Sequence, residues 1–147
     1  MDVAEQVYLA VQHGAARFRT IDEELGLSPA RFSVLATLRY GGPQRVGELA
    51  RREGVAQPTM TQSIRGLEAT DLVTRRATPD DGRGCLVELT PKGRALVRRA
   101  RARKIAWVAE VLDRMTGKER LALRAAAAEL DGQALLSGRA TDSRRRD

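Results

Sequence analysis

The stretch that decides the fold is VGELARREGVAQPTMTQSIRGLEATDLVTRRATPDDGRGCLVELTPKG, residues 46–93. It begins with a short helical run that stops at Gly54, and a second helical run follows over about 57–70. Two β-prone runs, 72–76 and 85–89, then flank a loop rich in Pro, Asp and Gly. This order predicts a helix-turn-helix followed by a β-hairpin wing.

The second helix of this pair has an apolar face and a polar face. Met60, Ile64 and Leu67 are spaced four and three residues apart, so they fall on one buried side. The opposite side carries hydroxyls, amides and a guanidinium, which can match the donors and acceptors of bases in the major groove of DNA. The residues that we expect on this reading face are Gln57, Pro58, Thr59, Thr61, Gln62 and Arg65. An ordinary solvated helix face has a similar composition, so the neighbouring elements must decide.

The predicted hairpin places cations directly after this helix. Arg83 lies near the tip of the loop, where an arginine can enter the minor groove of DNA. Asp81 is two residues away and could hold Arg83 by an ion pair. Arg75 and Arg76 lie on the first strand. The alternative is a solvated hairpin in which acids and bases compensate one another.

The positive charge of the chain is high, and it is concentrated in one part of the sequence. The chain has a formal net charge of +7 and a pI of about 10.6, which favours an anionic partner such as nucleic acid or an anionic membrane surface, with a solvated basic surface as the alternative. Residues 75–104 contain ten basic and three acidic side chains, a local excess equal to that of the whole chain. Phosphate neutralisation would use part of this excess and would make affinity fall steeply with salt. Some bases within 98–104 are expected to pair instead with the acids at 22–24 or with a second copy of the chain.

Helical periodicity marks the segments on both sides of the winged unit. Residues 3 to about 20 repeat apolar side chains every three or four positions. Ser28-Pro29 and Thr90-Pro91 are cap-and-proline signals for helix starts, and the second should open a long helix to about residue 115. A capping-box spacing from Thr116 to Glu119 predicts a last helix, which should end near residue 136.

Several classes of protein and site are not expected. An enzyme needs a nucleophile, a base and an orienting group, or a metal cluster, and this chain has one cysteine, Cys85, and one histidine, His13. It has no glycine loop that could cradle phosphate. We therefore predict no enzyme, no disulfide, no metal site and no cofactor, and we interpret Cys85 as a plain strand residue. Without a signal peptide or an apolar span, a cytoplasmic protein with no membrane partner is expected.

From about Leu25 to Leu96 the sequence resembles the MarR family of winged-helix transcriptional regulators. The segments that carry the resemblance are LGLSPARFSVLATL at 25–38, GELARREGVAQPTMTQSIRGLE at 47–68 and DLVTRRATPDDGRGCLVELTPKGRAL at 71–96. The resemblance implies a mainly α fold with a small β-hairpin wing, in a single domain over 1–136. The winged helix-turn-helix at about 28–90 would be flanked by dimerisation helices at about 1–24 and 91–136. The basic tail, 137–147, is expected to be disordered.

The resemblance also implies a function. It points to a homodimer that binds pseudo-palindromic double-stranded operators in a sequence-specific way and regulates transcription, often with release by a small phenolic or other anionic effector. Asp81 and Arg83 match the family's wing pair. Repression by occlusion is expected because no segment is left over for recruiting polymerase. The alternative is a dimer that uses the same unit to coat DNA without sequence preference or to contact other proteins.

Two further groups of residues follow from the resemblance. His13, Phe18 and Trp107 could line a ligand pocket, with core or surface packing as the alternative, and for His13 also a dimer contact. Four positions depart from the family pattern. Ala56 replaces the usual helix cap, and Arg65-Gly66 replaces an acid-then-base pair. Asp71 stands at the end of the helix, and Gly82 stands in the wing loop. Gly66 suggests a close backbone approach, and Gly82 suggests the loss of one phosphate contact.

Overall fold

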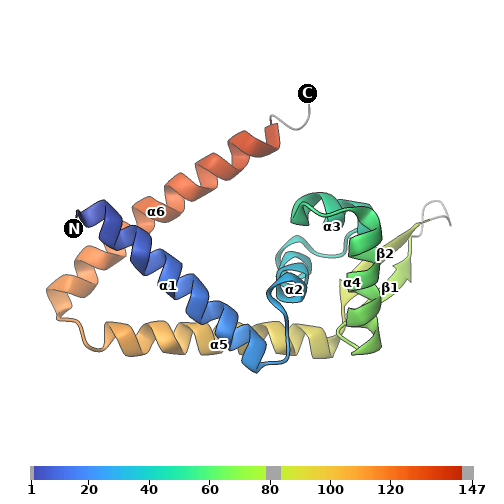
Figure 1. Cartoon of the computed structure of the whole chain (residues 1–147), viewed down its shortest axis with the longest axis horizontal. Coiled ribbons are helices and arrows are strands. Elements are labelled where there is room, and N and C mark those ends of the chain that lie inside the picture. Colours follow the sequence, from blue (N-terminus) through green and yellow to red (C-terminus); the bar gives the residue numbers. More distant parts are fainter. Residues whose placement is uncertain (1, 79–83, 144–147) are drawn as a thin grey trace. The chain divides into compact units, whose positions relative to one another are not determined.

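The computed structural model describes the backbone of residues 2–78 and 84–143 and the side chains up to residue 132 within those ranges. The elements are α1 (Val3–Glu24), α2 (Pro29–Gly41), α3 (Val46–Glu53), α4 (Gln57–Ala69), β1 (Val73–Ala77), β2 (Cys85–Leu89), α5 (Pro91–Leu112) and α6 (Gly117–Ser143) (Figure 1). The chain forms two compact units, Met1–Ile105 and Ala106–Asp147, which divide within α5. The fold is therefore mainly α with one small hairpin, as the sequence predicts.

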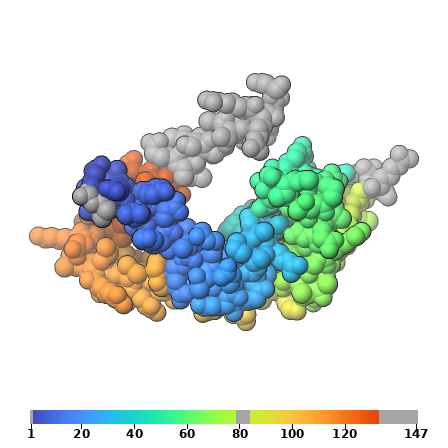
Figure 2. Space-filling view, in the orientation of Figure 1, coloured from blue at the N-terminus to red at the C-terminus, as the bar shows by residue number. Residues whose placement is uncertain are grey.

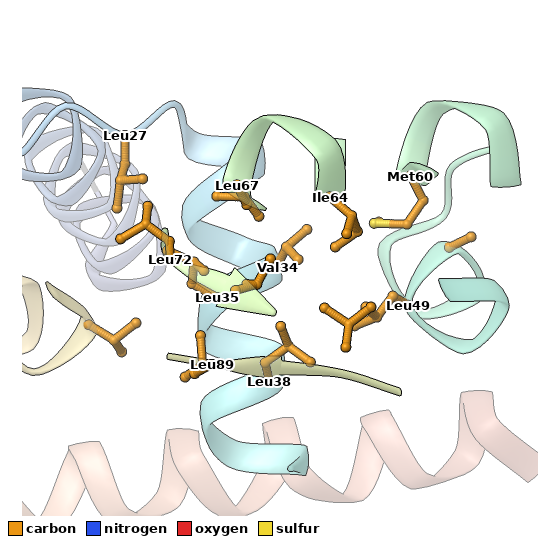
Figure 3. Packing of buried hydrophobic residues seen from close by; sticks show 14 residues of the cluster. Leu27, Val34, Leu35, Leu38, Leu49, Met60, Ile64, Leu67, Leu72 and Leu89 are labelled. Carbon is orange, nitrogen blue, oxygen red and sulfur yellow. The ribbon is translucent and has the colours of Figure 1, made fainter. Parts of the chain in front are cut away.

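The core of the first unit lies where α2, α3, α4 and the hairpin meet (Figure 3). Its fully buried side chains include Leu35 from α2, Leu49 from α3, Ile64 and Leu67 from α4 and Val87 from β2. Burial of each such side chain stabilises the fold by roughly 1.5–3 kcal/mol. The core thus joins the two helices of the helix-turn-helix to the base of the wing.

The second helix of the pair, α4, has the boundaries and the buried face that its sequence predicts. Met60, Ile64 and Leu67 are its buried residues. No side chain caps its start at Ala56, which agrees with the missing Ser or Thr there. The chain leaves the helix through Asp71, whose φ of 59° lies in the left-handed region that Asp tolerates better than most residues.

The hairpin is antiparallel, with Val73 opposite Leu89 and Ala77 opposite Cys85. A third segment joins it, because Gln44 and Val87 exchange both backbone hydrogen bonds, at 3.1 and 2.8 Å. Gln44 lies two residues before α3, so the start of the helix-turn-helix is fastened to the wing strand. The predicted hairpin is therefore confirmed at its base. Its loop, 79–83, lies outside the described residues.

Two predicted helix starts are confirmed by their caps. Ser28 Oγ accepts a hydrogen bond from the backbone N–H of Arg31 at 3.3 Å, and Thr90 Oγ1 accepts one from Gly93 at 3.0 Å. Proline follows each cap at the first helical position, where its missing N–H leaves no acceptor unpaired.

α1 ends at Glu24, at the bound expected for the N-terminal helix, where the N–H of Gly26, at φ 81°, bonds back to Glu23 O. Two other predicted helix ends were wrong by a few residues. α5 stops at Leu112 and not near 115. α6 continues past residue 136 to Ser143, across a stretch that contains no proline to break it.

The second unit holds the end of α5 and all of α6. The predicted capping box at the start of α6 is present: Glu119 Oε2 accepts the N–H of Thr116 at 2.8 Å, and Thr116 Oγ1 accepts the N–H of Glu119 at 3.4 Å. α6 exposes Leu121, Leu123 and Leu130. Within the described ranges, no helix combines the length and the apolar content needed to cross a bilayer.

Candidate nucleic-acid interface

α4 lies at the surface in the space-filling view (Figure 2), and its polar side chains are on the side opposite the core. Five of its six predicted reading residues are exposed: Gln57, Pro58, Thr59, Gln62 and Arg65. Thr61 is half-buried, and its hydroxyl donates to the backbone oxygen of Gln57 at 3.0 Å. α4 therefore presents two amides and a guanidinium to solvent from a helix whose other face is fixed in the core.

A carboxylate holds the preceding helix in place. Glu53, at the end of α3, accepts hydrogen bonds from two hydroxyls of α2, Ser33 Oγ at 2.6 Å and Thr37 Oγ1 at 2.8 Å. These half-buried bonds to a charged acceptor are stronger than bonds between neutral groups. Sequence reasoning missed this clamp, because nothing local indicates that Glu53 meets a helix about twenty residues earlier.

The two wing arginines on β1 have acidic neighbours. Arg75 Nε lies 3.0 Å from Glu68 Oε1 on α4, and Arg76 Nε lies 3.5 Å from Glu88 Oε2 on β2. Both pairs are partly exposed, so their net stabilisation is small. The Arg75 pair fixes the strand to the end of α4. The predicted DNA contacts of both arginines therefore compete with carboxylates, while Asp81 and Arg83 lie outside the described residues.

The base of the wing loop is closed by Thr78. Its N–H and its hydroxyl both donate to the backbone oxygen of Gly84, at 3.0 and 2.9 Å. Cys85 follows as a half-buried residue of β2. Among the described residues, no three His, Cys, Asp or Glu side chains are grouped to hold a metal ion.

Part of the basic run on α5 pairs with the acids at the end of α1, as one of the alternatives from sequence predicts. Lys104 Nζ lies 2.7 and 2.8 Å from the two carboxylate oxygens of the buried Asp22. It also lies 3.7 Å from the ring centre of Phe32 on α2, in a cation–π contact. These charges join α1, α2 and α5 and are not available to DNA.

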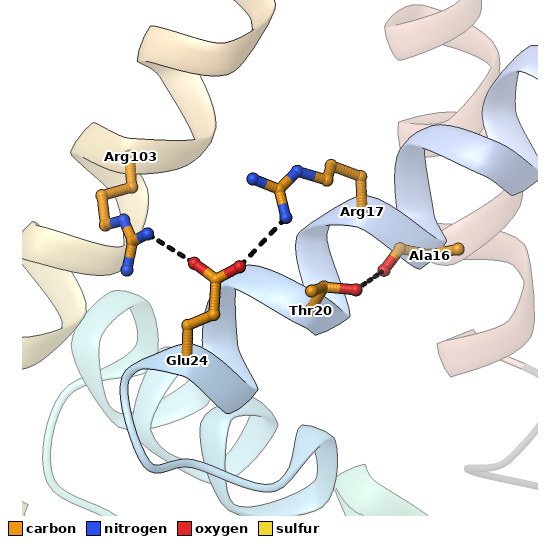
Figure 4. Close-up of polar contacts among 5 residues, drawn as sticks. All are labelled: Ala16, Arg17, Thr20, Glu24 and Arg103. Carbon is orange, nitrogen blue, oxygen red and sulfur yellow. Dashed lines mark hydrogen bonds and ion pairs between the residues drawn. The ribbon is translucent and has the colours of Figure 1, made fainter.

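An exposed carboxylate next to this junction is held in its ionised form. Glu24 accepts hydrogen bonds from Arg17 and from Arg103 (Figure 4). The hydrogen bond from Arg17, together with that from Arg103, lowers the pKa of Glu24 below its ordinary value of 4.5.

The predicted ligand-binding residues are not brought together in one described unit. His13 is exposed on α1, and Phe18 is half-buried with Lys104 Nζ 5.7 Å from its ring centre. Trp107 belongs to the second unit. Within the first unit, an open hollow lies between α2 and α3, lined by Ser33, Ala36, Thr37, Tyr40, Gly41, Arg52 and Glu53.

Gly66 has a neighbour that the sequence did not reveal. The departure at this position suggested a close approach of backbone, but the group that lies against Gly66 is the guanidinium of Arg31 from α2. Arg31 was not among the predicted site residues. No sequence pattern around Arg31 links it to Gly66, because Arg31 lies on α2 and Gly66 lies on α4.

Comparison with known proteins supports the winged-helix interpretation. The profile of the MarR family matches residues 27–85. The HTH-type transcriptional regulator MT0903.1 of Mycobacterium tuberculosis is 36% identical, over 85% of this chain and 87% of that protein. The HTH-type transcriptional repressor Rv2887 of M. tuberculosis is 37% identical, over 65% of this chain and 68% of that protein.

Solved structures share the fold. A mutant of S. aureus MepR bound to an oligodeoxyribonucleotide superposes with a TM-score of 0.75, covers 91% of this chain and 99% of its own and is 15% identical. At that identity the likeness concerns the fold alone, whereas the sequence identity to the M. tuberculosis relatives supports membership of the family. The chain therefore belongs to the MarR family and is a helix-turn-helix transcriptional regulator, not an enzyme.

Proposed function

We propose that the chain is a homodimeric repressor that binds a pseudo-palindromic double-stranded operator in the cytoplasm. The observation that carries the proposal is the exposed polar face of α4, with Gln62 and Arg65 in solvent and the opposite face fixed in the core. Glutamine can pair with adenine and arginine with guanine through two hydrogen bonds each. The S. aureus MepR mutant that shares this fold was solved bound to DNA, which supports the same use of the unit here.

The homodimer follows from the need to read two half-sites. Two copies of α4 related by a two-fold axis would meet the duplex about one helical turn apart. Exposed apolar side chains on α1, among them Tyr8 and Val11, supply surface for such an interface. Repression is supported by the name of the related M. tuberculosis repressor and would act by covering the promoter.

Release by a small phenolic or other anionic effector is part of the proposal. An effector acts only if it has different affinities for the DNA-binding and the free conformation. A phenolic anion such as 4-hydroxybenzoate should then raise the melting temperature of the free protein and lower its affinity for the operator. A rise in melting temperature with unchanged DNA affinity would contradict the effector role.

Sequence-specific binding is tested by selecting bound fragments of genomic DNA and footprinting the purified dimer on them. We expect a short protected region with an inverted repeat. Uniform protection of every duplex would favour the alternative, a dimer that coats DNA without sequence preference. No protection at low salt would contradict DNA binding altogether.

Two substitutions separate base reading from phosphate binding. Gln62→Ala should reduce discrimination between operator variants by roughly 1–3 kcal/mol per lost bidentate contact. Arg83→Ala should weaken binding to every duplex and lower the salt slope by about one unit. Equal losses for Gln62→Ala on specific and mixed DNA would show that Gln62 reads no base.

A further inference from the structure

Arg31 and Gly66 form a contact between α2 and α4. A Cβ built on Gly66 would overlap Nη2 of Arg31 and would lie 3.0 Å from Cζ and 3.6 Å from Nε. The guanidinium thus occupies the space that a side chain at position 66 would fill. Any larger residue at 66 would displace it.

The contact lies at the edge of the reading face. Gly66 follows Gln62 by four residues and Thr59 by seven, so the three share one side of α4. Gln62 and Thr59 are exposed, and Gly66 is half-buried under the arginine. Arg31 therefore adds a positive charge to the flank of α4, although it belongs to another helix.

Local stability does not explain this arrangement. Within the part of the chain that the structure describes, no carboxylate forms an ion pair with Arg31, whereas Arg75 and Arg76 both have one. Arg31 lies in the first turn of α2, where the positive end of the helix dipole disfavours a cation. Gly66 in turn weakens α4, because glycine is a poor helix former.

We propose that Arg31 is a further DNA-binding residue, which contacts a backbone phosphate beside α4, and that Gly66 is the space that admits it. The assignment rests on the proposed docking of α4 in the major groove, since a helix in that groove is flanked by phosphate chains. The planar fork of a guanidinium matches phosphate oxygens. A flanking contact of this kind strengthens binding to any sequence and reads no base.

The test measures binding of the full chain to a fluorescent duplex of mixed sequence over a series of salt concentrations. Arg31→Gln should lower affinity severalfold and reduce the slope of log affinity against log salt by about 0.9, the value for one phosphate contact. Arg39→Gln is the control. This substitution removes the same charge, and Arg39 is exposed at the other end of α2. Equal slopes for the wild type and Arg31→Gln, or an equal loss for Arg39→Gln, would overturn the assignment.

Gly66→Ala provides a second readout that a purely structural contact would not give. Alanine should raise the melting temperature by strengthening α4, and yet lower DNA affinity by displacing the guanidinium. The double variant Arg31→Ala with Gly66→Arg returns a cation to the same place and should recover most of the salt slope. Unchanged DNA affinity in Gly66→Ala would overturn the role of the glycine.

These results separate the two proposals. If the wild type binds the mixed duplex with a steep salt dependence and the Arg31 variants match it, only the assignment of Arg31 is wrong. If the wild type binds no duplex at low salt, the DNA-binding proposal is wrong, and the assignment of Arg31 is overturned with it.

Discussion

Gly93 shows how a single position is restricted by distant backbone. It lies in the first turn of α5, and a Cβ there would overlap the carbonyl oxygen of Leu72 and lie 3.0 Å from its carbonyl carbon. That same oxygen accepts the N–H of Thr90 at 3.1 Å, so it cannot move without loss of a bond. The glycine of the Leu-Thr-Pro-Lys-Gly segment is therefore required by the close approach of α5 to the turn after α4.

Gly93→Ala should lower the free energy of unfolding by about 1–3 kcal/mol, the usual cost of overpacking. Urea denaturation measures the change. Gly117→Ala is the matched control, because no described heavy atom lies within 4 Å of a Cβ built there, and alanine should be neutral or stabilising by up to about 1 kcal/mol. Equal stability of the two variants would show that α5 can move away from Leu72.

At the scale of elements, side-chain clamps hold the helices of the first unit. Glu53 fastens α3 to α2 through Ser33 and Thr37, and Lys104 fastens α5 to α1 through Asp22. Each clamp joins residues from different helices and adds charge-assisted hydrogen bonds to the apolar contacts beneath it. The first of these clamps adds a polar link between α2 and α3 to the core contacts of Leu49.

Glu53→Ala should destabilise the protein by about 1–3 kcal/mol, because two half-buried hydroxyls lose their acceptor. Glu53→Gln keeps one carbonyl oxygen as an acceptor and should therefore lower the stability by less than Glu53→Ala. Chemical denaturation of these variants and of Ser33→Ala, combined in a double-mutant cycle, measures the coupling between α2 and α3. Additive effects of the single changes would contradict the clamp.

Glu24 gives the end of α1 a defined dependence on pH. Because the hydrogen bond from Arg17 and the one from Arg103 lower its pKa in the folded state, its carboxylate stabilises the fold above its ordinary value of 4.5. This contribution is lost as pH falls through the lowered folded value. The melting temperatures of the wild type and Glu24→Gln should therefore converge below about pH 4.5.

A second carboxylate serves as the control for this titration. The pKa of Glu119 is also lowered, first by the backbone hydrogen bond from Thr116, but Glu119 lies in the other unit. Glu119→Gln should leave the contribution of Glu24 intact. A constant difference in melting temperature between wild type and Glu24→Gln from pH 7 to pH 3 would show that the Glu24 contacts do not depend on its charge.

At the scale of the whole molecule, the flanking helices α1 and α6 each expose several large apolar side chains. Tyr8 and Val11 on α1 are 61% and 59% exposed, and Leu121 and Leu130 on α6 are 68% and 56% exposed. Apolar side chains that lie together on one helix face can form part of a surface that associates. They are consistent with the proposed homodimer.

Val11→Glu should shift the protein toward monomer in analytical ultracentrifugation, because a carboxylate would be buried without a partner in the interface. It should also weaken binding to an inverted repeat more than to a single half-site. Tyr40→Glu is the control, since Tyr40 is 73% exposed on α2, outside the flanking helices. Sedimentation of Val11→Glu as an unchanged species would exclude this face of α1 from the interface.

Features set by neighbours in sequence could be predicted, and of the contacts between distant segments only the pairing of the basic run on α5 with the acids at the end of α1 was among the alternatives. Ser28 as a cap and the buried face of α4 through Ile64 depend on spacing within one helix, and both predictions are confirmed. The Arg31–Gly66 contact and the Glu53 clamp arise only when α2 folds against its neighbours. The reading residues of α4 and the wing remain predictions, since their roles depend on DNA.

The bridge between Gln44 and Val87 has a consequence for the choice of operator. Two backbone hydrogen bonds fasten the segment before α3 to the wing strand, so in the proposed complex with DNA the helix pair α3–α4 and the base of the wing would meet the duplex as one body. A duplex whose groove widths do not match that body must bend or twist to fit, and the elastic energy of doing so depends on base steps that the protein never touches. In the proposed operator, flexible base steps between the two half-sites should therefore favour binding although the protein does not contact them.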